Sequence, residues 1–228
     1  MKRIITLFFF LFLTVSTFAQ SSNGTLKFLG IPIDGTKEQM IRQLKGKGFT
    51  YNSEYEYLTG QFNGIKVNVY IHTNHNVVDR IFVADDNTLN ASQIRIRYNN
   101  LLSQMDQSEK YFSFVPNDPI PEDEDISYEM IVHKKSYSAS FYYNPLYDMS
   151  ENEQNQFVEE VRTEILSQEG IESVDEETFH NKLMALAISK LVMLSKGEVW
   201  FTISEYLGEY YISMYYDNLN NRPNGEDL

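Results

Sequence analysis

Residues 55–72 contain the feature that most restricts the fold, a pair of strand-like segments joined by Asn63-Gly64. An Asn-Gly pair readily adopts the positive φ angles of a type I′ turn, which connects two antiparallel strands. In the second segment, every other residue is a branched apolar side chain: Ile65, Val67, Val69 and Ile71. This two-residue period places them on one face of a sheet. The chain therefore forms an antiparallel hairpin with one buried face.

The first 19 residues have the pattern of a secretory signal peptide. A basic start, Met1-Lys2-Arg3, is followed by an apolar run over 4–15 and by Thr17-Phe18-Ala19, with small residues at the first and third positions. This order predicts cleavage after Ala19. An uncleaved membrane anchor is the alternative, but the run has about 12 residues, whereas a spanning helix needs about 20. We therefore expect a soluble periplasmic or secreted protein.

Composition excludes several classes of protein. The chain has no Cys. Disulfides, thiolate zinc sites and Cys nucleophiles are therefore excluded, and so is the Cys that accepts a lipid anchor. An exported chain of this kind depends on core packing for its stability. The formal net charge of −13 argues against nucleic acid and acidic membrane surfaces as partners, because both require clustered Lys and Arg.

Periodicity along the rest of the chain predicts an α+β fold, an antiparallel sheet of hairpins with helices packed on one face. Capping-box spacings, Thr36 to Gln39 and Ser150 to Glu153, open two of the helices. The predicted helices are 36–46, 90–108, 150–168 and 175–196. The further predicted strands are 26–33, 77–84, 126–133, 137–143, 198–204 and 209–217. In the last helix we expect one buried stripe, ended by Gly197: Phe179, Leu183, Leu186, Ala187, Leu191 and Leu194.

Two segments of the chain align without gaps, 126–146 and 199–219. Each is preceded by a predicted helix, which suggests two related helix-plus-hairpin units. The similarity could equally follow from the β propensity of aromatic residues alone. We therefore expect one domain over 20–217, with a possible subdivision near 147–150, followed by a polar tail over 218–228.

Three segments carry a resemblance to a known group. They are Gly-Ile-Pro-Ile-Asp-Gly-Thr within 26–49, Gly-Gln-Phe-Asn-Gly within 60–83, and Tyr-Tyr-Ile-Ser-Met-Tyr-Tyr-Asp-Asn within 210–227. The chain resembles uncharacterised exported proteins of Bacteroidetes-type bacteria. More distantly, helix followed by antiparallel strands is similar in architecture to β-lactamase-inhibitor proteins and to small outer-membrane assembly lipoproteins. The chain lacks the lipidated Cys of those lipoproteins, and the resemblance supplies no catalytic residues.

No familiar catalytic motif occurs in the sequence. His72 and His75 lie close to Asp79 in a hairpin, but this spacing does not make them converge on a metal, so we predict no metal site. The acidic loop over 118–125 lacks the alternation and Gly of an EF-hand, and we expect it to be solvated. We predict no cofactor and no catalytic residues.

Aromatic residues in the last predicted hairpin supply the candidate binding site. Val199, Phe201 and Ile203 alternate with more polar positions, and the returning strand alternates in the same way. The two-residue period therefore assigns three large aromatic side chains to the more polar face: Trp200, Tyr211 and Tyr215. Uncovered, they would form an anchor patch, because Trp and Tyr dominate interface hot spots. Covered by a helix, they would be a second layer of core.

These observations favour an exported, non-enzymatic interaction module that binds a protein partner. An accessory protein that stacks Trp200 and Tyr211 on a glycan, or that binds a peptide, is the alternative, and a concave aromatic groove would favour it over a flat patch. A hydrolase that uses two carboxylates is the third candidate, which requires a close acid pair in a cleft with one raised pKa.

Overall fold

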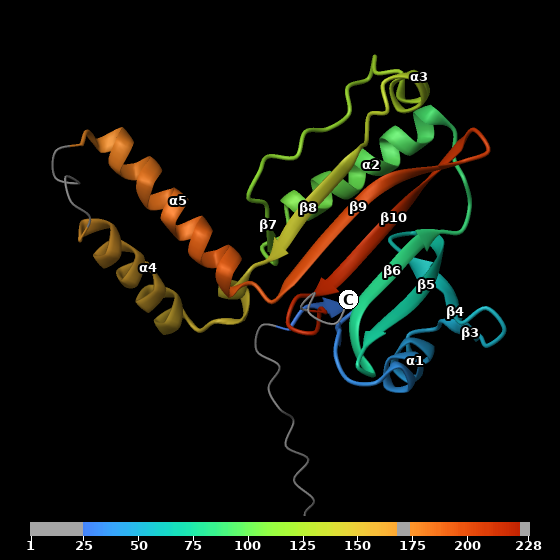
Figure 1. Ribbon diagram of the computed structural model, residues 1–228, viewed down its shortest axis with the longest axis horizontal. Coiled ribbons are helices and arrows are strands. Elements are labelled where there is room, and N and C mark those ends of the chain that lie inside the picture. Colours follow the sequence, from blue (N-terminus) through green and yellow to red (C-terminus); the bar gives the residue numbers. More distant parts are fainter. Residues whose placement is uncertain (1–24, 168–173, 224–228) are drawn as a thin grey trace, which may run out of the picture.

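The computed structural model describes residues 25–167 and 174–223. The predicted signal peptide over 1–19 lies outside these residues. Within them the chain forms five α-helices, an antiparallel sheet of eight strands and a small sheet of two strands, which confirms the α+β class (Figure 1). No helix in these two ranges is both long and apolar enough to cross a membrane.

The elements follow one another in a simple order. The helices are α1 (Lys37–Gly46), α2 (Ala91–Asp106), α3 (Ile126–Val132), α4 (Glu151–Leu166) and α5 (Glu176–Leu194). The small sheet pairs β1 (Lys27–Phe28) with β2 (Ile31–Pro32). The large sheet contains β3 (Thr50–Asn52), β4 (Tyr57–Phe62), β5 (Ile65–Asn74), β6 (Val77–Asp85), β7 (Tyr111–Phe112), β8 (Ser138–Tyr143), β9 (Gly197–Tyr206) and β10 (Glu209–Asn218).

The large sheet consists of two halves that meet at its centre. Its strand order is β3-β4-β5-β6-β10-β9-β8-β7. Each half is a run of four antiparallel strands preceded by a helix, with α1 before β3–β6 and α2 before β7–β10. The halves join where β6 pairs with β10 in antiparallel register. Each half thus contains four strands, whereas the predicted units were a helix plus a hairpin.

The turn at Asn63-Gly64 has the predicted geometry. Both residues have positive φ angles, 51° and 78°, and Phe62 pairs with Ile65 across the turn. Along β5 the alternate residues Val67 and Val69 are fully buried. The hairpin and its buried face are therefore confirmed.

Helices α1 and α2 share one core with a single face of the sheet. The predicted stripe of α2 is buried in that core: Ile94, Tyr98, Leu101, Leu102 and Met105. The same core contains Met40 and Leu44 of α1 together with alternate residues of β5, β6, β8, β9 and β10. In Figure 1, α2 lies along one side of β8, β9 and β10. The opposite face of the sheet is called the open face below.

The prediction of a strand over 126–133 is wrong, because these residues form α3. The Asp125 carboxylate caps the helix by accepting a hydrogen bond from the Tyr128 amide. Of the residues in α3 only Ile126 is buried, and Tyr128 and Ile131 are more than half exposed. Apolar residues occur at both odd and even positions here, so a strand would not place them all on one buried face. The two-residue period was therefore incomplete. The gap-free alignment of 126–146 with 199–219 therefore matches a helix to a strand.

Helices α4 and α5 form a two-helix arm that stands away from the sheet (Figure 1). They are inserted between β8 and β9, and their main packing contact is with each other. Phe157, Val161 and Ile165 of α4 are buried, but no residue of α5 is. The predicted buried stripe of α5 is therefore wrong, since α5 has only one neighbouring helix where the prediction assumed a core.

Both ends of the last hairpin differ from the prediction. Helix α5 ends at Leu194, with Ser195 as its C-cap, and Gly197 begins β9 instead of stopping the helix. A Cβ at Gly197 would lie 2.5 Å from the Leu26 Cβ, so the close approach of the N-terminal segment requires glycine. At the other end, Asn218 belongs to β10 and is only 2% exposed, and its amide donates to the Ile33 carbonyl at 2.6 Å. The polar tail therefore does not begin at 218.

Candidate functional site

The last hairpin places its aromatic residues on the open face. Trp200 is partly exposed between the buried Val199 and Phe201. Tyr211 and Tyr215 are the partly exposed members of the returning strand. The strand phase predicted from the sequence is confirmed, because these rings lie on the side opposite α1 and α2.

Register aligns Trp200 and Tyr215 with three further aromatic residues. Trp200 pairs with Tyr215 across β9 and β10, and Tyr215 pairs with Phe82 across β10 and β6. Phe82 pairs with Tyr70 on β5, which pairs with Tyr57 on β4. One ring from each of five neighbouring strands thus forms the aromatic row, defined as Tyr57, Tyr70, Phe82, Tyr215 and Trp200.

Most rings in the aromatic row stack on their neighbours. Centroids of Trp200 and Tyr215 are 3.9 Å apart with an interplanar angle of 11°, and those of Tyr215 and Phe82 are 4.7 Å apart at 17°. Phe82 and Tyr70 follow at 5.4 Å and 23°, and the last pair is tilted. Near-parallel rings with centroids this close must be stacked face to face. Rings lying side by side in one plane would have centroids farther apart. The row therefore presents ring edges to solvent.

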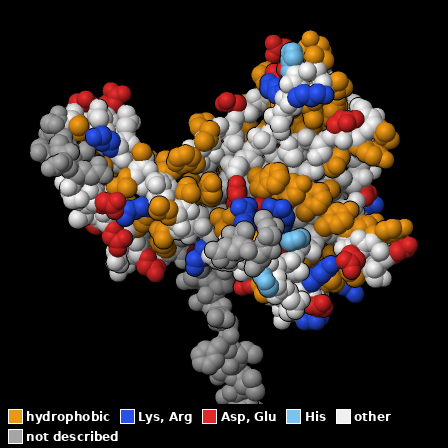
Figure 2. Space-filling view, viewed as in Figure 1, with side chains coloured by type: hydrophobic (Ala, Val, Ile, Leu, Met, Phe, Trp, Pro, Cys, Tyr) orange, Lys and Arg blue, Asp and Glu red, His pale blue; other side chains and the backbone are white. Residues whose placement is uncertain are grey.

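Figure 2 shows this band of hydrophobic side chains crossing the sheet toward β3 and β4. Tyr70 is 38% exposed, and the other members of the row are partly exposed. Basic side chains, Lys or Arg, and histidine side chains border the band on one side (Figure 2). An apolar band of this length with a polar border is typical of a recognition surface.

Four charged residues form the charged border of the aromatic row: Arg80, Glu198, Asp217 and Arg222. At its centre is Asp217, which is only 1% exposed. Its carboxylate forms a bidentate pair with Arg80, with Nη2 donating at 3.0 Å. It also accepts from Arg222 Nη2 at 2.6 Å and from Trp200 Nε1 at 3.1 Å. Arg222 contacts Glu198 as well, at 3.2 Å. The Asp217 carboxylate therefore fixes two guanidinium groups and the indole of Trp200.

Asp217 stays ionised because of these partners. Burial alone would raise its pKa, but the hydrogen bonds to the charged form outweigh burial and lower the pKa below its ordinary value of 3.8. The Arg80 guanidinium also lies 5.4 Å from the Tyr215 ring centroid, a cation–π distance. Arg222 bridges the carboxylates of Asp217 and Glu198 on this face. The raised pKa that the hydrolase candidate requires occurs instead at Asp85, where burial raises the pKa against the opposing effect of Arg97.

The histidines considered as metal ligands do not converge. His72 Nδ1 lies 2.6 Å from an oxygen of Asp79, whereas His75 is an exposed turn residue with a φ angle of 47°. Across 25–167 and 174–223, no group of three or more His, Cys, Asp or Glu residues could hold a metal ion. In the acidic loop, Glu124 bonds to the Lys135 ammonium and the Tyr137 hydroxyl.

The sequence analysis identified Trp200 and Tyr215 as site residues. It did not identify the other three members of the aromatic row: Tyr57, Tyr70 and Phe82. The two-residue period of 65–72 places Tyr70 on the face opposite Val67 and Val69, but nothing in the sequence shows that β6 pairs with β10. That pairing brings Phe82 beside Tyr215. Tyr211 lies on the same face but outside the row, opposite Ser204.

Comparison of the chain with models of protein families, with curated proteins and with solved structures found no match. The resemblance to exported Bacteroidetes-type proteins stays a prediction. The case for a function therefore depends on the open face itself.

Proposed function

We propose that this protein is an exported, non-enzymatic interaction module that binds a protein partner on the open face of its sheet. The observation that carries the proposal is the aromatic row, in which Trp200, Tyr215 and Phe82 form a continuous stack across three strands. Large aromatic side chains supply most of the free energy of many interfaces because they bury much area with few rotatable bonds. The signal-like segment over 1–19 supports export.

Rigidity of the site supports the same function. Trp200 is held by Tyr215 on one side and by its hydrogen bond to Asp217. Side chains that are already ordered lose little conformational entropy when a partner binds. The bound and free forms of the open face should therefore be similar.

Ring orientation favours a protein partner over a glycan. A sugar stacks on the face of an aromatic ring, but Tyr215 has one face against Trp200 and the other against Phe82, so within this stack a ring face is left only at its two ends. Their outward edges form a narrow apolar ridge, which fits an apolar depression on a protein. A glycan remains an outcome of the binding test described next.

The test uses the chain without residues 1–19 as bait on envelope extract from a Bacteroidetes-type bacterium. We expect a partner protein to bind the wild type and to be lost by the double variant Trp200→Ala/Tyr215→Ala. Each removed hot-spot ring should cost about 2 kcal/mol, so the Kd for the purified partner should rise about 30-fold for one ring and about 1,000-fold for both.

Tyr128→Ala is the matched control, because Tyr128 is a 52% exposed aromatic on α3, away from the open face. Its Kd should equal that of the wild type. Equal binding by the wild type and the double variant would overturn the proposal, as would a glycan array in which the wild type binds sugars and no envelope protein does.

A further inference from the structure

One side of the arm is apolar and open. A groove of about 310 Å³ runs between α4 and α5. It is lined mainly by apolar side chains: Phe157, Val158, Val161, Leu183, Met184 and Ala187. Val158 is 56% exposed and Met184 is 46% exposed. Helical spacing continues this surface from Met184 along α5 through Ile188 and Leu191. We call this side of the arm its apolar face.

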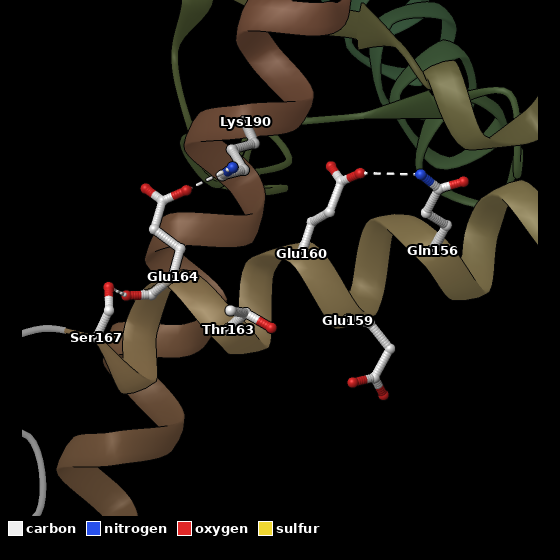
Figure 3. Close-up of a pocket in the computed structure, with 7 residues that line it drawn as sticks. All are labelled: Gln156, Glu159, Glu160, Thr163, Glu164, Ser167 and Lys190. Carbon is white, nitrogen blue, oxygen red and sulfur yellow. Dashed lines mark hydrogen bonds and ion pairs between the residues drawn. The ribbon is translucent and has the colours of Figure 1, made fainter.

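The other side of the arm is polar, as Figure 3 shows. There Lys190 of α5 forms an ion pair with Glu164 of α4 at 2.6 Å. Gln156 donates to Glu160 at 3.2 Å along α4. The arm thus separates a charged side from a mainly apolar one, which is the pattern of a helix pair that buries only one side.

We propose that the apolar face of the arm joins two copies of this chain in a two-fold dimer, in which the four arm helices pack as a bundle. Two antiparallel helices leave half of their apolar surface in water, and a second pair covers it. A two-fold contact uses the same patch on both copies, so any charge in the patch lies near the same charge of the other copy. The patch should therefore contain few charged residues. The groove meets this condition, because Arg162 is its only charged lining residue.

Charge and area both suit a second copy. The acidic residues Glu159, Glu160 and Glu164 lie around the other hollow of the arm, so two negatively charged chains can meet without burying them. A 19-residue helix is about 28 Å long, and two helices side by side span about 20 Å. The resulting face is about 560 Å² in projection, below the roughly 800 Å² per partner of a standard interface, which fits a dimer of micromolar affinity.

Sedimentation velocity of the chain without residues 1–19 tests this dimer. We expect a dimer at about 100 µM. Met184→Glu places a charge in the apolar face and should raise the dimer Kd at least tenfold. Thr163→Glu introduces the same charge on the polar side and should leave the Kd unchanged. Should Met184→Glu lose helix content by circular dichroism, Met184→Gln replaces it, with the same direction expected.

A monomeric wild type at that concentration would overturn the dimer, as would a folded Met184 variant that dimerises as tightly as the wild type. The outcome is independent of the open face, because Trp200→Ala/Tyr215→Ala should still form the dimer. Loss of partner capture and loss of dimerisation therefore report on different surfaces.

Discussion

The indole of Trp200 lies on the ring of Tyr215, with centroids 3.9 Å apart and planes inclined by 11°, and its Nε1 donates to the buried carboxylate of Asp217. Trp200 therefore links the ring of Tyr215 to the carboxylate of Asp217. The aromatic row and the charged border are consequently one rigid unit, and substitutions there should affect stability as well as recognition.

The ring contact should appear as a coupling energy. In a double-mutant cycle with Trp200→Ala and Tyr215→Ala, we expect the losses in free energy of unfolding to differ from additivity by about 0.5–1.5 kcal/mol. Urea denaturation at neutral pH measures it. Strictly additive losses would mean that the two rings do not stabilise each other.

Asp217→Asn should destabilise the protein strongly. The substitution removes a buried charge and leaves the guanidinium groups of Arg80 and Arg222 without their shared partner. Breaking a buried pair from one side typically costs about 3–5 kcal/mol, and the partial exposure of both arginines places this case at about 3 kcal/mol. Asp86→Asn is the control, because its ion pair with the half-exposed Lys66 should be worth about 1 kcal/mol or less.

The contribution of Asp217 should also depend on pH. Its pKa is lower in the folded than in the unfolded chain, so the unfolded chain binds more protons and stability rises with pH through this range. The contribution is complete above the ordinary pKa of 3.8 and is lost as pH falls through the lower folded value. Denaturation of wild type and Asp217→Asn at pH 7 and at about pH 2.5 should therefore give a smaller difference in acid. A difference that grows in acid would contradict the lowered pKa.

A close approach at Gly60 should make glycine necessary there. An added Cβ would overlap the ring of Phe49, which is buried in the core. Gly60→Ala should therefore lower the free energy of unfolding by about 1–3 kcal/mol. Gly46→Ala is the control in α1, where nothing lies within 4 Å of the added Cβ, and it should raise stability by about 0.5–1 kcal/mol. Equal effects of the two substitutions would contradict this packing.

The capping role of Asp125 tests the assignment of α3. Asp125→Ala removes the acceptor for the Tyr128 amide and should cost about 1 kcal/mol, with faster hydrogen exchange over 126–132. Asp123→Ala, two residues earlier in the same exposed loop, should change neither quantity. Identical behaviour of the two variants would favour the strand originally expected over 126–133.

Local signals in the sequence were reliable where side-chain period and turn chemistry agreed. The Asn63-Gly64 turn, the α2 stripe and the phase of Trp200 could all be predicted, because each depends on neighbours within one element or one hairpin. The segment 126–132 could not, since its apolar residues fall at both odd and even positions and the Asp125 cap decides its structure.

Long-range pairing was outside the reach of the sequence. The aromatic row exists because β6 and β10, more than a hundred residues apart in the chain, pair at the centre of the sheet. The buried position of Asp217 follows from the same pairing, which sets it opposite Arg80. The exposure of α5 is also decided by tertiary structure. The sequence of an apolar helix does not show whether one helix or a whole core packs against it.

Trp200 is the only tryptophan of the chain, so one label reports directly on the open face. The most direct test is ¹⁹F NMR of the chain labelled with 5-fluorotryptophan, titrated with the unlabelled envelope partner. We predict a single resonance with a solvent-isotope shift in the free protein, which moves or broadens in proportion to partner bound and reaches its end point at one partner per chain. A resonance that stays unchanged when the partner is saturating would show that the partner binds elsewhere and would contradict the proposed function.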